Sequence, residues 1–193
     1  MKLQRRAASM LALALLAAGS VRANDDEGWK ALKEGGQVVL MRHAQSEPGV
    51  GEPPNMRLDD CATQRNLSEG GRKQAKAIGD AIRAHGIAVD RVISSPMCRC
   101  IDTAKLAFGR VDETQHAGNP RSGTEDQTKI VREMRALASE KHRGGNVIVV
   151  SHGRTIAAVT ELQPEPGEMI IVTPQGDGKF AVLARLQPAP LPK

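Results

Sequence analysis

Aromatic residues are almost absent from this chain. Its 193 residues include one tryptophan, two phenylalanines and no tyrosine, namely Trp29, Phe108 and Phe180. A hydrophobic core must therefore consist mainly of aliphatic side chains. Aromatic rings are also the platforms on which proteins stack unpaired bases. Their scarcity argues against single-stranded nucleic acid, and we expect no nucleic-acid partner.

Cysteine is also rare, and its spacing excludes the usual zinc sites. The three cysteines are Cys61, Cys98 and Cys100. A structural zinc site takes four ligands, and a C-x-C pair with one distant cysteine does not supply them. The sequence also has no carboxylate cluster of the kind that binds Mg²⁺. We therefore expect neither a metal nor another cofactor.

The apolar run near the N-terminus is too short to span a bilayer, but it fits an export signal. Residues 1–23 combine a basic start, an apolar run over 10–18 and the cleavage-like sequence V-R-A ending at Ala23. This order is typical of a secretory signal peptide. We predict a signal peptide over 1–23, a domain over 24–193, a periplasmic or secreted location and no membrane span after cleavage.

The positive charge of the chain belongs mostly to this leader. The formal net charge is +5, and residues 1–23 hold four basic residues and no acidic one, which leaves +1 for residues 24–193. A charge so close to zero gives no electrostatic reason to expect a nucleic-acid or membrane partner.

Apolar runs alternate with segments of helical periodicity after residue 24. Strands are expected over 38–41, 92–93 and 147–151, with a final hairpin from 169–172 and 180–186. Helices are expected around 29–32, from Ser68 to Gly86, after 94–96, over 130–137 and over 156–159. Loops rich in Gly and Pro are expected over 45–65 and 109–124. The alternation predicts a single α/β domain, a three-layer sandwich with a mostly parallel central sheet flanked by helices.

Basic and imidazole side chains stand where several of these elements end or begin. Arg42 and His43 follow the first strand, His152 follows the strand over 147–151, and Arg99 opens a helix. Ligands of open sheets bind at the carboxyl ends of strands, and helix N-termini and arginines attract phosphate. Two arginines and two histidines thus predict a phosphoryl site in which one imidazole can attack phosphorus.

Four segments in order carry a resemblance to a known family. They are LMRHA over 40–44, LSEGGRKQA over 67–75, SSPMCRCIDTA over 94–104 and VSHG over 150–153. Together they resemble the histidine phosphatase superfamily of phosphoglycerate mutases and histidine acid phosphatases. The resemblance implies that His43 is the nucleophile and that Arg42, Arg99 and His152 form the phosphate pocket. Ala44 replaces the usual glycine.

The resemblance does not settle the proton donor. Superfamily members often carry a glutamate after the second signature helix or an aspartate directly after the second histidine, and here Gly153 takes the latter place. Our first candidate is Glu168, at the entry to a late strand, and Glu113 and Glu125 remain open. Arg65 is interpreted as a brace for its loop and left out of the site.

The resemblance implies a phosphomonoesterase that hydrolyses a small phosphorylated substrate through a phosphohistidine, without a metal. The alternative is a phosphate-binding protein with little turnover, since a clear proton donor is missing. A mutase is disfavoured because the short chain offers little material for a lid over its product. A phosphatase acting on protein phosphohistidine belongs to the first class, but export argues against it.

The cysteines add a prediction about the same region. An exported protein can keep a disulfide, and Cys98 and Cys100 flank Arg99. If Arg99 and the loop over 45–65 both face the phosphate pocket, Cys61 comes near this turn. Positions two apart on a helix start point in different directions, so only one of the two can pair well with Cys61. We predict a Cys61–Cys98 disulfide, because Cys98 lies on the turn and Cys100 can then pack as a small apolar residue. Cys61–Cys100 is the alternative.

Overall fold

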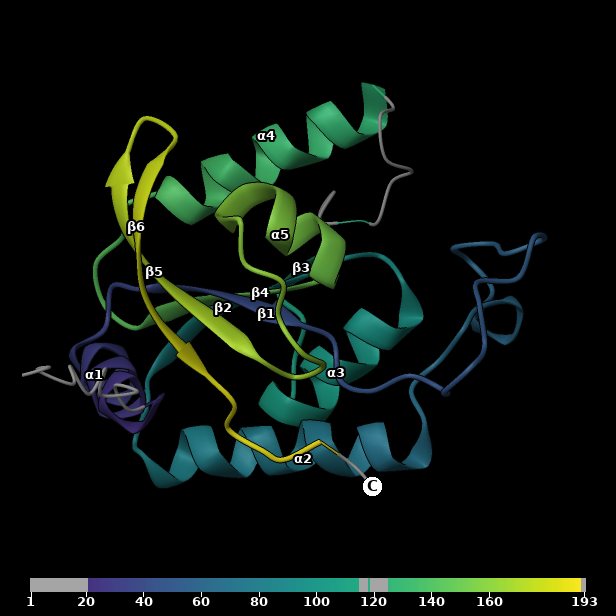
Figure 1. Ribbon diagram of the computed structural model, residues 1–193, viewed down its shortest axis with the longest axis horizontal. Coiled ribbons are helices and arrows are strands. Elements are labelled where there is room, and N and C mark those ends of the chain that lie inside the picture. The colour runs from purple at the N-terminus through teal and green to yellow at the C-terminus, as the bar shows by residue number, and fades with distance from the viewer. Residues whose placement is uncertain (1–20, 115–117, 119–124, 192–193) are drawn as a thin grey trace, which may run out of the picture.

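A six-stranded sheet runs through the middle of the molecule, and helices cover both of its faces (Figure 1). The computed structural model describes residues 21–114, 118 and 125–191, with side chains for 25–112, 118 and 127–191. The strands are β1 (Val38–Arg42), β2 (Val89–Ser94), β3 (Glu113–Thr114), β4 (Asn146–Ser151), β5 (Met169–Gly176) and β6 (Lys179–Leu186). The helices are α1 (Val21–Glu34), α2 (Glu69–Ala84), α3 (Cys98–Phe108), α4 (Glu125–Ser139) and α5 (Gly153–Thr160), with a 3₁₀ turn η1 (Cys61–Thr63).

The strand order is β3-β2-β4-β1-β5-β6. The first four strands pair in parallel, whereas β5 and β6 are antiparallel. Asp177 and Gly178, the two residues between β5 and β6, both have positive φ, as a tight hairpin turn requires. The predicted three-layer sandwich, its mostly parallel sheet and its final hairpin are confirmed.

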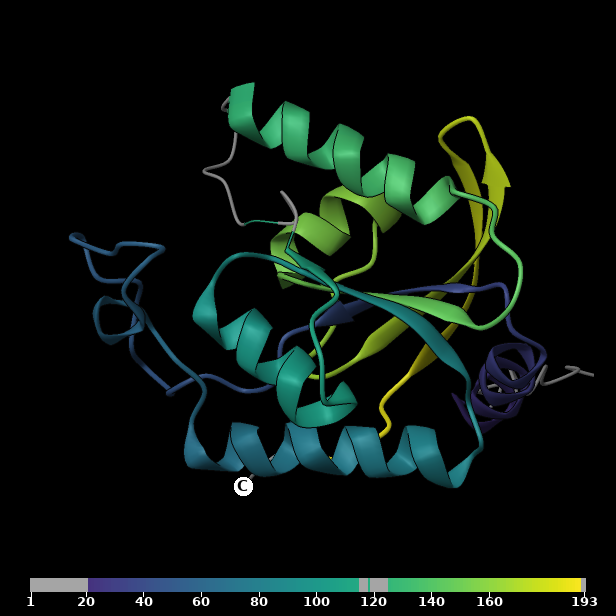
Figure 2. The ribbon, with the colours of Figure 1, turned by 180° about the vertical axis from the view of Figure 1, so that it is seen from behind.

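The two faces of the sheet bury separate aliphatic clusters. Side chains of a strand alternate between faces, so Val39 and Met41 of β1 pack with Ile78 of α2, whereas Leu40 packs with Met134 of α4. Figure 2 shows the same layers from behind, with α2 and α3 on one side and α4 and α5 on the other. The core is aliphatic, as the scarcity of aromatic residues requires.

The helix that follows the site loop starts at a side-chain cap. The Ser68 hydroxyl accepts a hydrogen bond from the Gly71 N–H at 3.0 Å, which satisfies one free donor of the first turn of α2. A Cβ at Gly71 would collide with the Gln45 carbonyl. Glycine therefore lets α2 approach the chain just after β1, and the predicted start of this helix at Ser68 is confirmed.

A few elements differ from the sequence-based expectation. The loop predicted over 109–124 contains β3, whose two residues are too few to show a periodic pattern. Helix α4 begins at Glu125 and ends at Ser139, so it extends beyond both ends of the expected range 130–137. The predicted cleavage site at Ala23 falls within α1, and residues 1–20 lie outside the described part of the chain. Within the described ranges, no helix has the length and apolar character needed to cross a membrane.

Candidate active site

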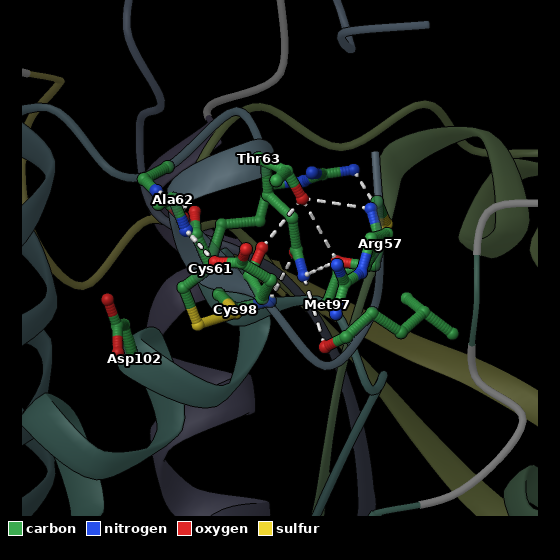
Figure 3. Close-up of a disulfide and its surroundings, with 12 residues drawn as sticks. Arg57, Cys61, Ala62, Thr63, Met97, Cys98 and Asp102 are labelled. Atoms are coloured by element: carbon green, nitrogen blue, oxygen red, sulfur yellow. Dashed lines mark hydrogen bonds between the residues drawn. A yellow bond between two sulfur atoms is a disulfide. The ribbon is translucent and has the colours of Figure 1, made fainter. Parts of the chain in front are cut away.

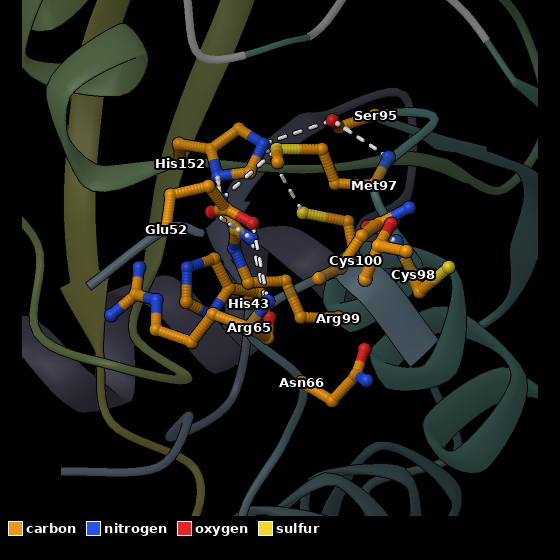
Figure 4. Close-up of polar contacts among 12 residues, drawn as sticks. His43, Glu52, Arg65, Asn66, Ser95, Met97, Cys98, Arg99, Cys100 and His152 are labelled. Carbon is orange, nitrogen blue, oxygen red and sulfur yellow. Dashed lines mark hydrogen bonds and ion pairs between the residues drawn. The ribbon is translucent and has the colours of Figure 1, made fainter. Parts of the chain in front are cut away.

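Two histidines meet beyond the ends of β1 and β4 (Figure 4). Arg42 pairs with Ser151 in the parallel register, so the next residues, His43 and His152, leave the sheet side by side. Their ring centroids are 5.4 Å apart and the ring planes make an angle of 67°. Both side chains are buried. The sheet register thus brings together two residues that are 109 positions apart in the sequence.

The hydrogen bond of His43 fixes its tautomer. Nδ1 lies 2.7 Å from the Ala44 carbonyl oxygen, which can only accept, so Nδ1 carries the proton. Burial lowers the pKa of His43 from 6.5 to about 3, with the charges of Arg99, Arg42 and Arg65 adding to the effect. At neutral pH the imidazole is therefore uncharged and keeps a lone pair on Nε2.

His152 is also held in the neutral form. Burial lowers its pKa well below 6.5, and His43 and Arg99 act in the same direction. Its Nε2 lies 2.9 Å from the Ser95 hydroxyl oxygen. Its Nδ1 lies 3.4 Å from Arg99 Nη2, which can only donate. Burial raises the pKa of the neighbouring Cys100 thiol to about 12. Cys100 is therefore no competing nucleophile at neutral pH.

Two predicted arginines border these rings. The Arg99 side chain, at the start of α3, is completely buried, and its Nη1 donates to the Glu52 carboxylate at 2.8 Å. Arg42 closes β1, and its Nη1 donates to the Pro164 carbonyl at 2.9 Å. The geometry therefore brings both arginines to the histidine pair, as the predicted phosphate pocket requires.

The cationic groups of the site have unused donors. Among the described residues, the Nε atoms of Arg42, Arg65 and Arg99 are buried without a hydrogen-bond partner. Burial lowers the pKa of Arg42 and of Arg65, and the nearby charge of Arg99 lowers that of Arg65 further. A buried donor without a partner is costly, so a tetrahedral oxyanion with several acceptor oxygens suits this cluster.

Residues 38–121 match the sequence profile of the histidine phosphatase superfamily (branch 1). This match covers less than half of the chain. The match includes Arg42, His43 and Arg99, whereas His152 lies beyond it and is added by the fold. A phosphoglycerate mutase from Candida albicans is 35% identical over 77 residues, which are 40% of this chain and 29% of that protein. The match therefore spans less than a third of this curated relative.

Solved structures share the histidine phosphatase fold over most of the chain. The protein histidine phosphatase SixA, solved with tungstate, superposes with a TM-score of 0.56 at 18% identity, covering 79% of this chain and 97% of SixA. A phosphoserine phosphatase from Entamoeba histolytica, solved with phosphoserine, gives a TM-score of 0.58 at 15% identity, covering 77% and 95%. At such identities the likeness establishes the fold alone.

The Glu168 side chain is engaged away from the histidines. Its carboxylate accepts bonds from Arg185 Nε at 2.6 Å and Nη2 at 2.9 Å, and from the Glu165 N–H at 2.7 Å. Its backbone carbonyl accepts from the Arg42 N–H, and its charge acts on the Arg42 guanidinium. Proton transfer by this carboxylate would have to break the pair with Arg185. The side chains of the other two candidates, Glu113 and Glu125, lie outside the described residues.

Sequence reasoning missed residues that the loop over 45–65 brings to the histidines and Arg99. Glu52 contacts Arg99, and the Arg65 N–H donates to the same carboxylate at 3.1 Å. Gln64 accepts from the Cys98 N–H at 2.9 Å and so caps α3. Irregular loops have no periodicity from which such placements follow. Arg65 was noted in the sequence but interpreted as a loop brace.

A disulfide attaches this loop to the helix that carries Arg99 (Figure 3). It joins Cys61 of η1 to Cys98, with the two Cα atoms 5.7 Å apart, and Cys100 is a buried free thiol. The prediction of Cys98 as the partner is confirmed. The link ends one residue before Arg99, so the loop and the first turn of α3 are held together covalently.

Proposed function

We propose that this protein is a phosphomonoesterase that hydrolyses a small phosphorylated substrate through a phosphohistidine on His43, without a metal. The observation that carries the proposal is the neutral His43, whose unprotonated Nε2 lies in a pocket bordered by buried guanidinium groups. A neutral imidazole is nucleophilic, and the arginines stabilise the charge of the phosphoryl group that it attacks.

Each residue then has a defined role. His43 Nε2 attacks phosphorus, and the bond from phosphorus to the ester oxygen breaks. Arg42 and Arg99 bind the non-bridging oxygens of the transferring phosphoryl group. His152, held by Ser95 at Nε2, accepts from the Arg99 guanidinium at Nδ1 and so orients that phosphate ligand. Water then attacks the phosphohistidine, which releases phosphate and restores His43.

The relatives support phosphoryl chemistry of this kind. SixA is named a protein histidine phosphatase, and the phosphoserine phosphatase was solved with phosphoserine. The Candida protein is a phosphoglycerate mutase. We further propose that the protein acts in the periplasm or outside the cell, because the Cys61–Cys98 disulfide suits an oxidising compartment. The proposed signal peptide over 1–23 agrees with that location.

A turnover assay with an aryl phosphate, with and without a chelator, tests the proposal. We expect hydrolysis that the chelator leaves unchanged and that His43→Ala abolishes, with an acid-labile, base-stable phosphoryl label on the quenched wild-type protein. His85→Ala, which removes an exposed histidine at the end of α2, is the control and should keep full activity. Full activity in His43→Ala would refute the mechanism, whereas phosphate binding without turnover would favour the binding-protein alternative.

A further inference from the structure

The Glu52 carboxylate contacts the Arg99 guanidinium and the backbone of Arg65, among the side chains drawn in Figure 4. One oxygen accepts from Arg99 Nη1 at 2.8 Å and the other from the Arg65 N–H at 3.1 Å. Its side chain is 28% exposed, whereas that of Arg99 is completely buried. Glu52 thus lies between the solvent and the groups that would hold a phosphoryl oxygen.

We propose that Glu52 is the catalytic acid that protonates the leaving group and the base that then activates water. The proposal rests on the phosphomonoesterase function and completes it, because an alkoxide leaving group needs a proton when its bond to phosphorus breaks. No residue predicted from the sequence supplies that proton from within the described pocket.

The partner of Glu52 explains how an ion-paired carboxylate can become an acid. Arg99 is also a proposed phosphate ligand, so a bound phosphoryl dianion competes with Glu52 for the same guanidinium. The displaced carboxylate then lies close to a dianion, and a like charge nearby favours the protonated form of a carboxyl group. Substrate binding therefore favours the uptake of a proton from solvent by the partly exposed Glu52 carboxylate.

Glu168 does not have this property. Its partner Arg185 belongs to β6, and the Glu165 N–H also donates a hydrogen bond to the Glu168 carboxylate. A phosphoryl group bound by Arg42 and Arg99 does not compete for Arg185, so the Glu168 pair persists when substrate binds. The two carboxylates therefore differ in whether the substrate can release them.

The chain next to Glu52 has open space around it. Gly49 and Gly51 are exposed, and a Cβ built on either would meet nothing within 4 Å. The base of the same loop is fixed by Gln64 on the Cys98 N–H and by the Cys61–Cys98 disulfide. Glu52 can therefore shift from Arg99 to the leaving oxygen while the rest of the loop stays attached to α3.

The proposed steps balance. In the first, His43 Nε2 forms a bond to phosphorus, the ester oxygen leaves with the bonding pair, and the Glu52 carboxyl gives it a proton. In the second, water attacks phosphorus and gives a proton to the Glu52 carboxylate while the bond from phosphorus to Nε2 breaks. The products are an alcohol and phosphate, and both His43 and Glu52 return to their initial states.

The test compares two substrates in Glu52→Gln, which keeps the shape of the side chain but cannot transfer the proton. For an unactivated alkyl phosphate we expect kcat/KM to fall about 100-fold or more, the usual scale of general acid catalysis. For an aryl phosphate, whose phenolate leaves without help, the fall should stay below about fivefold. The parameter kcat/KM is used because it covers only the steps up to phosphoryl transfer to His43.

Two further measurements separate an acid from a structural residue. Glu47→Gln, an exposed carboxylate of the same loop, should leave both substrates unaffected. The inhibition constant for inorganic phosphate should stay equal or fall in Glu52→Gln, because a competitor for Arg99 is gone. A structural role would instead raise it and slow both substrates alike.

Equal losses on both substrates, no loss on either, or a raised phosphate inhibition constant would each overturn the proposal. A selective loss that appears in Glu168→Gln, Glu113→Gln or Glu125→Gln but not in Glu52→Gln would overturn it as well. If the wild-type protein hydrolyses neither substrate, the phosphomonoesterase function itself fails, which is a different result from loss in one variant.

Discussion

The pocket has two halves that are held in different ways. His43 and His152 leave adjacent parallel strands, and the backbone ladder between β1 and β4 sets their separation. Glu52 and Arg65 come from a long loop that extends from the main body beside α3 in both ribbon views (Figures 1 and 2). A short backbone bridge between Ser46 and Leu67 closes the base of this loop, and side-chain contacts and one disulfide attach the loop to α3. The sheet half is suited to hold the phosphoryl group in a fixed position. The loop half is suited to change its contacts when the phosphoryl group binds.

The sharpest test concerns Arg99 of α3, which connects the two halves because it contacts both His152 and Glu52. The variant is Arg99→Lys. Lysine keeps the charge but loses the planar pair of donors that can grip two phosphoryl oxygens. We expect kcat/KM for an aryl phosphate to fall roughly tenfold to a thousandfold, the scale of one lost charge-assisted contact. Arg83→Lys, an exposed change on α2, is the matched control. An unchanged kcat/KM in Arg99→Lys would show that Arg99 does not bind the phosphoryl group.

The placement of the two histidines could be predicted because short sequence patterns identify the strands that precede them. Four apolar residues before Arg42 predict a buried strand, and parallel pairing then brings the residue after each strand to one edge. The contacts of the loop half depend on where a chain without periodicity folds back. Nothing in the residues around Glu52 indicates that its carboxylate meets Arg99. The choice of Glu168 followed its strand-entry position, and the partner that engages it, Arg185, lies 17 residues away on β6.

Removal of the disulfide tests how far the loop half depends on its covalent link. The bond closes a loop of 37 residues, for which the chain-entropy model gives about 4 kcal/mol, an upper value. We expect Cys61→Ser/Cys98→Ser to lose about 2–4 kcal/mol of unfolding free energy and to raise KM. Wild-type protein treated with a reductant should behave like the double variant.

The state of the thiols gives an independent check of the same link. Peptide mapping of the denatured, non-reduced protein should find one alkylatable thiol, at Cys100, and a linked peptide containing Cys61 and Cys98. Three alkylatable thiols would refute the disulfide. Unchanged stability and KM after its removal would show that Gln64 and the remaining contacts suffice to hold the loop.

The buried histidines make a smaller, pH-dependent contribution. The pKa of His43 is about 3 in the folded protein against 6.5 for the ordinary side chain. His43 therefore takes up a proton near pH 6.5 in the unfolded chain but only near pH 3 in the folded protein. The free energy of unfolding consequently falls as the pH drops from 6.5 toward 3. Between pH 7 and pH 5, this proton uptake should lower the unfolding free energy of wild type by about 2 kcal/mol more than that of His43→Gln.

Denaturant unfolding of both proteins at the two pH values measures this difference. The carboxylates titrate in both proteins, so their contribution cancels in the comparison. His85→Gln, at the exposed end of α2, controls for the loss of a histidine as such and should show a smaller shift. Parallel stability curves for wild type and His43→Gln would contradict the burial of a neutral His43.

The smallest expected effect concerns the contact that orients His152 within the sheet half. The Ser95 hydroxyl is fully buried and lies 2.9 Å from His152 Nε2, which leaves Nδ1 to accept from the Arg99 guanidinium. Ser95→Ala removes one neutral hydrogen bond, worth about 0.5–1.5 kcal/mol, so kcat should fall about threefold to tenfold with little change in KM. The neighbouring Ser94→Ala is the control, because the Ser94 hydroxyl bonds only a backbone carbonyl at 2.8 Å among the described contacts. An equal loss in both variants would assign the effect to packing at the end of β2, whereas a loss confined to Ser95→Ala would show that the orientation of His152 limits the reaction.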